Sequence, residues 1–328
     1  MESGELPEVC YPQANNSCRA PKQPPGQAML IYVLLSSISI ITVVLNLLVI
    51  FSITYFRQLH TPTNLLLLSL SVSDLLVGVL LMPVEIIYIE ACWLLGDVAC
   101  TLYYVIDYII TSASVANMVL ISADRYMAIC RPLSYLCYIT NRTMHVGVSL
   151  CWLCSIAYRL LLLHDHLRKP GRSNSCLGEC VVVISKVAGT VDLVFTFALP
   201  ILVILVLYVQ VLVVAFHHAR GIRSQVGAIQ APRMVKKSEL KAARTLAIVV
   251  AVFLLCFCPY YSPTITGKDT LVDATTVAFE IWLTHFNSCL NPIIYALFYP
   301  WFRKCIKLIL TLQIFKPGCR DVSIFSNV

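Results

Sequence analysis

The sequence predicts an all-α membrane protein, built as a bundle of seven transmembrane helices. Of its 328 residues, 59% are apolar and only 12% are charged, whereas an ordinary soluble domain is about 25% charged. The apolar residues lie in runs longer than the ~20 residues that a helix needs to cross a bilayer. These runs are too long for barrel strands and do not alternate with a period of two, so helices are expected. Soluble globular, disordered and fibrous proteins are thereby excluded.

Seven expected spans follow one another along the chain. No charged residue occurs between Lys22 and Arg57, which defines the first span. The other spans fall at 63–90, 98–123, 144–163, 187–215, 242–265 and 275–299. After the last span, Pro300 begins the segment PWFRKCIKLILTL. Its apolar residues recur at helical spacing with basic residues between them, which is typical of a helix on the membrane surface.

Basic residues set the expected orientation. They concentrate in one set of loops and in the tail, and the positive-inside rule makes that side cytoplasmic and the N-terminus external. The net charge of +7 is thus divided across the membrane and does not indicate nucleic-acid binding. The acidic start, MESGELPEVCYP, lacks the features of a cleavable signal peptide. The expected regions are an extracellular N-terminus at 1–26, a seven-transmembrane domain at 27–299, an amphipathic helix at 300–313 and a cytoplasmic tail at 314–328.

Cysteines and a glycosylation motif agree with this orientation. Asn15-Asn16-Ser17 is an external glycosylation sequon with Asn15 as its acceptor. Six cysteines fall on the external side, where the environment favours disulfides, and their spacing alone leaves the pairing open. They are Cys10, Cys18, Cys92, Cys100, Cys176 and Cys180.

Charged residues inside the spans indicate functional sites, because a charge in the membrane is costly. Asp74 lies in the middle of the second span, Asp107 in the third and Asp192 in the outer part of the fifth. Eighteen residues separate Asp107 from Arg125, which is about five helical turns or 27 Å. Both side chains therefore project from one face at opposite depths, and the third helix can couple an external site to an internal one.

The ordered motifs resemble the class A, rhodopsin-like G-protein-coupled receptors along nearly the whole chain. Two positions depart from that pattern: Leu45 stands where the family usually has glycine, and Phe257 replaces the tryptophan that acts as a ligand-contact trigger. The matching motifs, in chain order, are Asn46, Asp74, Cys100, Asp124-Arg125-Tyr126, Trp152, Pro200, Tyr208, Cys256-Phe257-Cys258-Pro259 and Asn291-Pro292-Ile293-Ile294-Tyr295.

A finer resemblance is to the trace amine-associated receptors, most of which detect volatile amines in vertebrate olfaction. It rests on the run at 287–302 with its Tyr-Pro-Trp-Phe ending, on FRQLHTPTNLL at 56–66 and on Cys-Leu-Gly-Glu-Cys at 176–180. The resemblance implies a receptor without enzymatic activity or a resident cofactor. Its implied partners are a small amine, membrane lipid and a stimulatory or olfactory G protein that raises cyclic AMP. Its implied location is the plasma membrane of olfactory cilia.

Two acidic residues define the expected ligand. Asp107 matches the family's amine-binding aspartate, and a protonated amine forms a charge-assisted hydrogen bond with a carboxylate. Asp192 lies about two helical turns before Pro200, where the family's side chain faces the pocket across from Asp107. Adjacent helices pack about 8–10 Å apart, so the two carboxylates are expected to hold a diamine such as cadaverine or putrescine. Alternatively, Asp192 pairs with Lys186 or Arg159, and the protein is a monoamine receptor.

Aromatic side chains are expected to complete the pocket, although bundle packing explains each of them equally well. They are Tyr108, Tyr260, Tyr261 and Trp282. His285 replaces a tyrosine that is frequent in amine receptors, and its protonation is expected to repel a cation. An amine transporter is the alternative from another functional class, but the spans show no internal repeat of the kind that transporters contain.

The resemblance also implies disulfide pairs for the external cysteines and roles for residues in the inner half of the bundle. It implies that Cys100 pairs with Cys180. Cys176 then pairs with Cys10 or Cys18, and Cys92 pairs with the other; we favour Cys18 for Cys176. The implied G-protein switch comprises Asp124, Arg125, Tyr126, Tyr208, Glu239, Asn291, Pro292 and Tyr295. The implied sodium pocket comprises Asp74, Ser114, Asn287, Ser288 and Asn291, and a water-filled polar network is the alternative to a bound ion.

Overall fold

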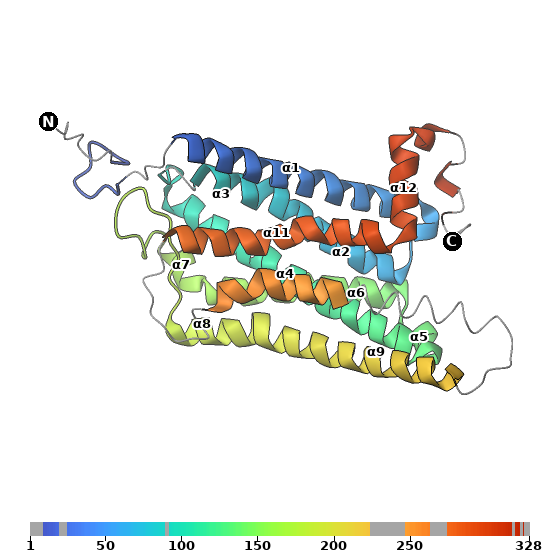
Figure 1. Cartoon of the computed structure of the whole chain (residues 1–328). Helices are drawn as coiled ribbons and strands as arrows, with labels where there is room; N and C mark the ends of the chain where they lie inside the picture. The colour runs from blue at the N-terminus through green and yellow to red at the C-terminus, as the bar shows by residue number, and fades with distance from the viewer. Residues whose placement is uncertain are drawn as a thin grey trace.

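The long apolar runs form long helices that lie side by side in one bundle (Figure 1). The structure is a computed structural model, and it describes residues 9–19, 25–88, 92–223, 247–262, 274–316, 319–321 and 324. Within these residues, five helical stretches are long and apolar enough to cross a membrane. The helix Ala247–Ser262 and the C-terminal helix of the bundle complete the seven expected spans.

The helices of the bundle agree with the expected spans. They are α1 (Pro25–Tyr55), α2 (Pro62–Leu76) with α3 (Met82–Tyr88), α4 (Gly96–Cys130), α6 (Asn141–Leu162), α8 (Lys186–Asp192) with α9 (Leu199–Arg223), Ala247–Ser262 and α11 (Ala274–Phe298). Two π-helical turns, Val77–Leu81 and Leu193–Ala198, join the paired segments within the second and fifth spans. The shorter elements are α5 (Pro132–Tyr138), α7 (His164–Arg168), α12 (Pro300–Leu310) and the 3-10 turns Arg57–Leu59, Gln313–Phe315 and Cys319–Asp321.

Local sequence explains several helix ends. The Thr61 side chain accepts a hydrogen bond from the Asn64 amide at the start of α2, and Pro62 occupies the first turn. Both are favoured at helix N-termini. The amphipathic helix α12 ends at Leu310, short of the expected 313, because Leu312 adopts a left-handed backbone conformation with φ of 56°. In contrast, α4 continues past the expected end at 123, so Asp124-Arg125-Tyr126 is helical.

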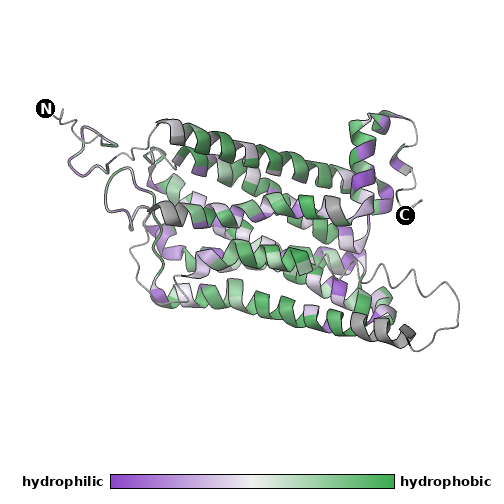
Figure 2. Ribbon diagram, in the orientation of Figure 1, coloured by the Kyte–Doolittle hydropathy of each residue, from purple (hydrophilic) through white to green (hydrophobic). Residues whose placement is uncertain are grey.

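The bundle exposes apolar residues on its outside and buries polar residues inside, as expected for a protein in lipid. Most residues of the long helices are apolar (Figure 2), and many of them are exposed; Met29 and Leu30 on α1 are each 70% exposed. Polar side chains are buried between the helices, including Asn46, Asp74 and Asn291 at 0–1% exposure. A surface that is apolar outside and polar inside is stable only where hydrocarbon replaces water.

Three disulfides lie at the end of the bundle that carries the N-terminal segment, which we call the amino end. They join Cys100 to Cys180, Cys18 to Cys176 and Cys10 to Cys92. The resemblance implies the first pair, and the favoured choice of Cys18 for Cys176 leaves Cys10 for Cys92, as observed. Short bridges between Val9 and Arg19 and between Ser17 and Leu177 add backbone pairing. The N-terminal segment is thus fastened to the loop that precedes α8.

Gly178 allows these connections to pass close to one another. Its φ of +101° is in the region that favours glycine, and a Cβ there would lie 2.6 Å from the Cβ of Cys10. The Trp93 amide donates a hydrogen bond to the Gly178 carbonyl. The Cys-Leu-Gly-Glu-Cys motif therefore supplies both two disulfide partners and the glycine that lets a third disulfide pass.

The opposite end of the bundle, the carboxyl end, carries α12 across the ends of the long helices (Figure 1). The helix buries Trp301, Phe302 and Cys305 against the bundle. Further along the chain, the Ile324 amide donates to Oε1 of Gln58 at 2.8 Å. The C-terminal segment therefore folds back onto the connection between α1 and α2.

Candidate ligand-binding site

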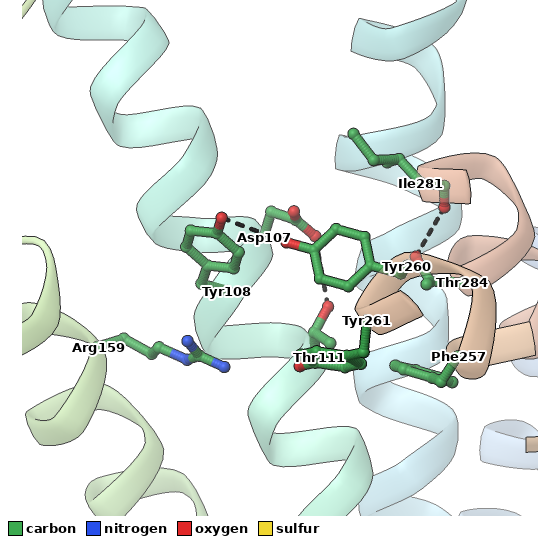
Figure 3. Close-up of a pocket in the computed structure, with 9 residues that line it drawn as sticks. All are labelled: Asp107, Tyr108, Thr111, Arg159, Phe257, Tyr260, Tyr261, Ile281 and Thr284. Carbon is green, nitrogen blue, oxygen red and sulfur yellow. Dashed lines mark hydrogen bonds between the residues drawn. The ribbon is translucent and has the colours of Figure 1, made fainter. Parts of the chain in front are cut away.

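A small cavity lies between α4, α6, the helix Ala247–Ser262 and α11 (Figure 3). It contains one of the two predicted acidic residues and the three predicted tyrosines. Its lining residues are Asp107, Tyr108, Thr111, Arg159, Phe257, Tyr260, Tyr261, Ile281 and Thr284. Asp107 lies within the first third of α4 counted from its start at Gly96, so the cavity is nearer the amino end.

Asp107 belongs to a hydrogen-bonded cluster that extends across three helices. Its Oδ1 lies 3.0 Å from Nε2 of His285 on α11, and it accepts from the Thr111 hydroxyl at 3.4 Å. The other ring nitrogen of His285 lies 3.0 Å from Oε2 of Glu85 on α3. Tyr103 donates to the remaining oxygen of Glu85 at 3.0 Å. The sequence pattern did not predict that Glu85 contacts this cluster.

The charge of His285 follows from this geometry. A neutral imidazole donates through only one nitrogen, so hydrogen bonds from both ring nitrogens to two ionised carboxylates match the protonated ring. Glu85, His285 and Asp107 together then carry one net negative charge. We expected protonated His285 to face and repel a ligand cation; instead, its charge is shared by the two carboxylates. The cluster therefore retains attraction for one positive charge.

Asp192 is not a free second acid, and the prediction that it faces Asp107 across the pocket is wrong. Its Oδ1 accepts from Nη1 of Arg159 at 2.6 Å, from Thr196 at 2.8 Å and from Tyr158 at 3.3 Å. Arg159 also donates through Nε to Ser112 and through Nη2 to Thr196. The pair is deeply buried, with Arg159 1% and Asp192 5% exposed. Arg159 is among the residues that line the cavity, and Asp192 is not.

This ion pair weakens the diamine hypothesis in energetic terms. A second ammonium would have to displace the Arg159 guanidinium from Asp192. Breaking a buried ion pair by removing one partner costs about 3–5 kcal/mol, and the displaced guanidinium would itself need new partners. The alternative left open by the sequence, an Arg159–Asp192 pair, is the one present in the structure.

Some of the predicted aromatic residues line the cavity, and one of them packs elsewhere in the bundle. The hydroxyls of Tyr108 and Tyr260 lie 3.3 Å apart, and Figure 3 shows both rings beside Asp107. Tyr261 stacks on Phe197 at a centroid distance of 4.6 Å. Trp282 does not line the cavity; it packs in an apolar cluster that includes Leu81. Its assignment as a ligand contact is therefore corrected.

Several lining residues were not predicted from the sequence. Thr111 follows Asp107 by four residues, a spacing that places both on one helix face, so this neighbour was open to inference. Phe257 lines the cavity and stacks on Phe253 at 4.3 Å, in place of the family's tryptophan. Arg159 was expected only as an alternative partner of Asp192, and nothing in the sequence placed it in the lining of the cavity.

A second polar cluster lies deeper, around Asp74. The carboxylate is fully buried and accepts from Nδ2 of Asn291 at 2.9 Å. Within the described part of the chain, its other oxygen, Oδ1, has no hydrogen-bond partner, and neither have the side-chain oxygens of Asn287 and Asn291. Ser114, also buried, donates to Ser73 at 2.9 Å. Unpartnered buried oxygens of this kind are the ligands that a hard cation or ordered water satisfies.

Near the carboxyl end, Arg125 is held by Asp124 of its own helix. Its Nε donates to Oδ2 of Asp124 at 3.0 Å, and its Nη2 contacts both this oxygen and Thr63. Tyr135 of α5 donates to the other oxygen of Asp124 at 3.2 Å. Glu239, the expected partner of Arg125 on the sixth span, lies outside the described residues.

The other predicted switch residues occupy the same half of the bundle. Tyr126 packs against an apolar cluster of Ile129 and Val211. Tyr208 and Tyr295 belong to the large apolar core, and Pro292 lies inside α11.

Seven spans, a charged cavity near one end and a helical Asp-Arg-Tyr near the other define a seven-transmembrane receptor. The chain matches the family described as 7 transmembrane receptor (rhodopsin family) over residues 45–295. This is a family of receptors, not enzymes, and the comparisons do not support a transporter.

Comparison with individual relatives identifies the group of rhodopsin-like receptors to which the chain belongs. The chain is 36% identical to trace amine-associated receptor 13c of Danio rerio over 97% of its length and 96% of the relative. It is equally similar to trace amine-associated receptor 4 of Mus musculus, with the same coverage. Trace amine-associated receptor 5 of Mus musculus is 36% identical over 99% of this chain and 98% of the relative. The chain belongs to the trace amine-associated receptor family.

Proposed function

We propose that the protein is a receptor for small protonated amines and that Asp107 binds the ammonium group. The observation that carries this proposal is the net negative charge of the Glu85–His285–Asp107 cluster beside a cavity lined by tyrosines. A carboxylate in a poorly hydrated cavity forms a strong charge-assisted hydrogen bond with an ammonium. Aromatic faces add about 0.5–2 kcal/mol per cation contact.

The charge balance favours a ligand with one positive charge. The Arg159–Asp192 pair is neutral, and the cluster around Asp107 carries one negative charge, so a monocation neutralises the site. A second ammonium would meet the guanidinium. We therefore propose a monoamine receptor and not the diamine receptor that the sequence favours.

The amino end is proposed to face the cell exterior, which places the cavity within reach of external amines. The three disulfides support this orientation because they form in oxidising compartments, and exposure of the Asn15 side chain leaves it open to glycosylation. The carboxyl end then faces the cytoplasm and a stimulatory or olfactory G protein. Arg125, Tyr126, Tyr208, Pro292 and Tyr295 are proposed to switch that contact, in the cilia of olfactory neurons.

A comparison of an amine with an alcohol of the same chain length tests whether the receptor requires a positive charge on its ligand. Cells that express the receptor should raise cyclic AMP in response to hexylamine and show no response to hexanol, because only the amine carries an ammonium for Asp107. Untransfected cells serve as the control for endogenous amine responses. An equal response to the alcohol, or none to any amine of a broad panel at verified surface expression, would refute the amine receptor.

A sodium ion is proposed to bind beside Asp74. The oxygens of Asp74, Asn287 and Asn291 that have no partner among the described residues support this site. Ser288 contacts Asp74, and Ser114 donates a hydrogen bond to Ser73, the residue before Asp74. These side chains supply neutral and anionic oxygen, the donor set that a hard cation takes. Water in the same space is the alternative.

Sodium should raise the thermal midpoint of the purified receptor when it replaces N-methylglucamine at constant ionic strength. An ion present at ten times its Kd stabilises by about 1.4 kcal/mol. Asp74→Asn should abolish this increment, because the variant lacks the negative charge that holds the cation. An identical sodium response in both proteins would show that the space holds water only.

A further inference from the structure

We infer that Arg159 is a second ligand-recognising group, and that the preferred ligand is a primary amine with a neutral acceptor oxygen at its far end. This inference rests on the proposed function and specifies its ligand class. It replaces the second acid expected from the sequence by a hydrogen-bond donor.

The position of Arg159 is the first argument. Asp107 and Arg159 line the same cavity, and the ring of Tyr108 lies between them. Figure 3 shows the guanidinium extending from α6 toward the cavity beside this ring, with its central carbon 5.0 Å from the ring centroid. A ligand whose ammonium contacts Asp107 and whose chain crosses Tyr108 therefore directs its other end toward the guanidinium.

The donor count is the second argument. A guanidinium carries five N–H groups in a fixed plane. The hydrogen bonds to Ser112, Asp192 and Thr196 use three of them, one on each nitrogen. Each terminal nitrogen has one further N–H, and the Tyr261 phenol is a hydrogen-bond partner for one of these two groups. One N–H of the guanidinium therefore stays available to a ligand. An arginine that only neutralised Asp192 would gain by directing both terminal groups at the carboxylate, but Nη2 instead donates to Thr196.

Charge balance decides which acceptor is preferred. Asp192 already neutralises Arg159, and the ligand ammonium neutralises the cluster around Asp107. A hydroxyl or carbonyl oxygen accepts from the guanidinium and leaves the site neutral. A second ammonium would instead add a positive charge next to the arginine.

Three ligands of equal size isolate the far-end group: hexylamine, aminopentanol and cadaverine each have seven non-hydrogen atoms in a straight chain. Aminopentanol should be more potent than hexylamine by roughly three- to tenfold, as expected for a hydrogen bond to a charged donor after desolvation. Cadaverine should be the weakest of the three. Thermal stabilisation of the purified receptor gives the same ranking without reliance on a particular G protein.

Two variants assign this preference to Arg159. Arg159→Met leaves the Asp192 carboxylate without its cation, so the ranking should reverse and cadaverine should become the most potent ligand. Arg159→Met/Asp192→Leu removes both charges from the site, and hexylamine should then be the most potent. A reversed ligand ranking in the first variant, and no preference for cadaverine in the second, would show that the Arg159–Asp192 pair sets specificity. A general folding defect would not produce this pattern.

The outcomes separate this inference from the proposed function. If all three amines act only through Asp107 but cadaverine equals or exceeds aminopentanol on the wild-type receptor, the Arg159 inference is overturned and the amine receptor stands. If none of them stabilises or activates the wild-type protein at any tested concentration, the proposed function fails first. The ranking on the unmodified receptor needs no variant, so a folding defect in a variant does not remove the test.

Discussion

Asp107→Asn should reduce the potency of hexylamine by roughly a hundredfold or more while surface expression is maintained. Each tenfold change corresponds to about 1.4 kcal/mol, and a hydrogen bond to a charged group contributes about 1.5–3 kcal/mol. The amide preserves the size of the side chain but removes its charge. Glu85 and His285 then neutralise each other, and a bound ammonium would be left without a counter-charge. The measurement is a concentration–response curve for cyclic AMP.

Asp97→Asn is the matched control for this substitution. Asp97 lies ten residues before Asp107 on the same helix, α4, and therefore closer to the amino end. It is exposed and accepts a hydrogen bond from Asn174. Its loss removes the same charge from the amino end, but from solvent, where screening weakens its field. Similar small shifts for both variants would mean that the ligand senses only the general negative field and that Asp107 does not contact it.

The fold could be predicted from the sequence because lipid restricts the choices so strongly. A backbone that crosses hydrocarbon must satisfy its own hydrogen bonds, so a long apolar run is helical whatever its neighbours are. The ends were less predictable, because they depend on local groups. The apolar run alone ends at 123, and only the helical spacing of Asp107 and Arg125 indicated that α4 continues to Arg125. Nothing in the sequence predicted the left-handed Leu312 that ends α12.

The positions of the candidate site on each helix were predictable, including Tyr260 and Tyr261 on the sixth span, but the contacts between side chains of different helices were not. Asp107 and Tyr108 face the cavity as expected from their place on α4. In contrast, the contact of His285 with Glu85 joins α11 to α3, and a pairing of that kind depends on how two helices are rotated about their axes. Asp192 shows the difficulty most directly. Counting back from Pro200 assumes 3.6 residues per turn, but the π-helical turn Leu193–Ala198 intervenes, and its wider turns change the direction of the side chain.

Arg159→Met should lower the stability of the receptor by about 3–5 kcal/mol, because it leaves the Asp192 carboxylate buried without its cation. The thermal midpoint of the purified protein should fall accordingly. Arg159→Met/Asp192→Leu should recover most of this loss, since replacing a whole buried ion pair by apolar residues is often neutral or stabilising. If the two side chains did not interact, the stability losses caused by the two substitutions would instead add up in the double variant.

The exposed pair Arg172–Asp165 provides the control. Its guanidinium and carboxylate lie 3.2 Å apart, with both side chains largely in solvent, and the hydrogen bond from Arg172 lowers the pKa of Asp165. Solvent screens such a pair, so Arg172→Met should change the thermal midpoint very little. If Arg159→Met is equally harmless, the Asp192 carboxylate is hydrated or already faces the ligand. The two-acid site predicted from the sequence would then regain its basis, and a diamine would again be the expected ligand.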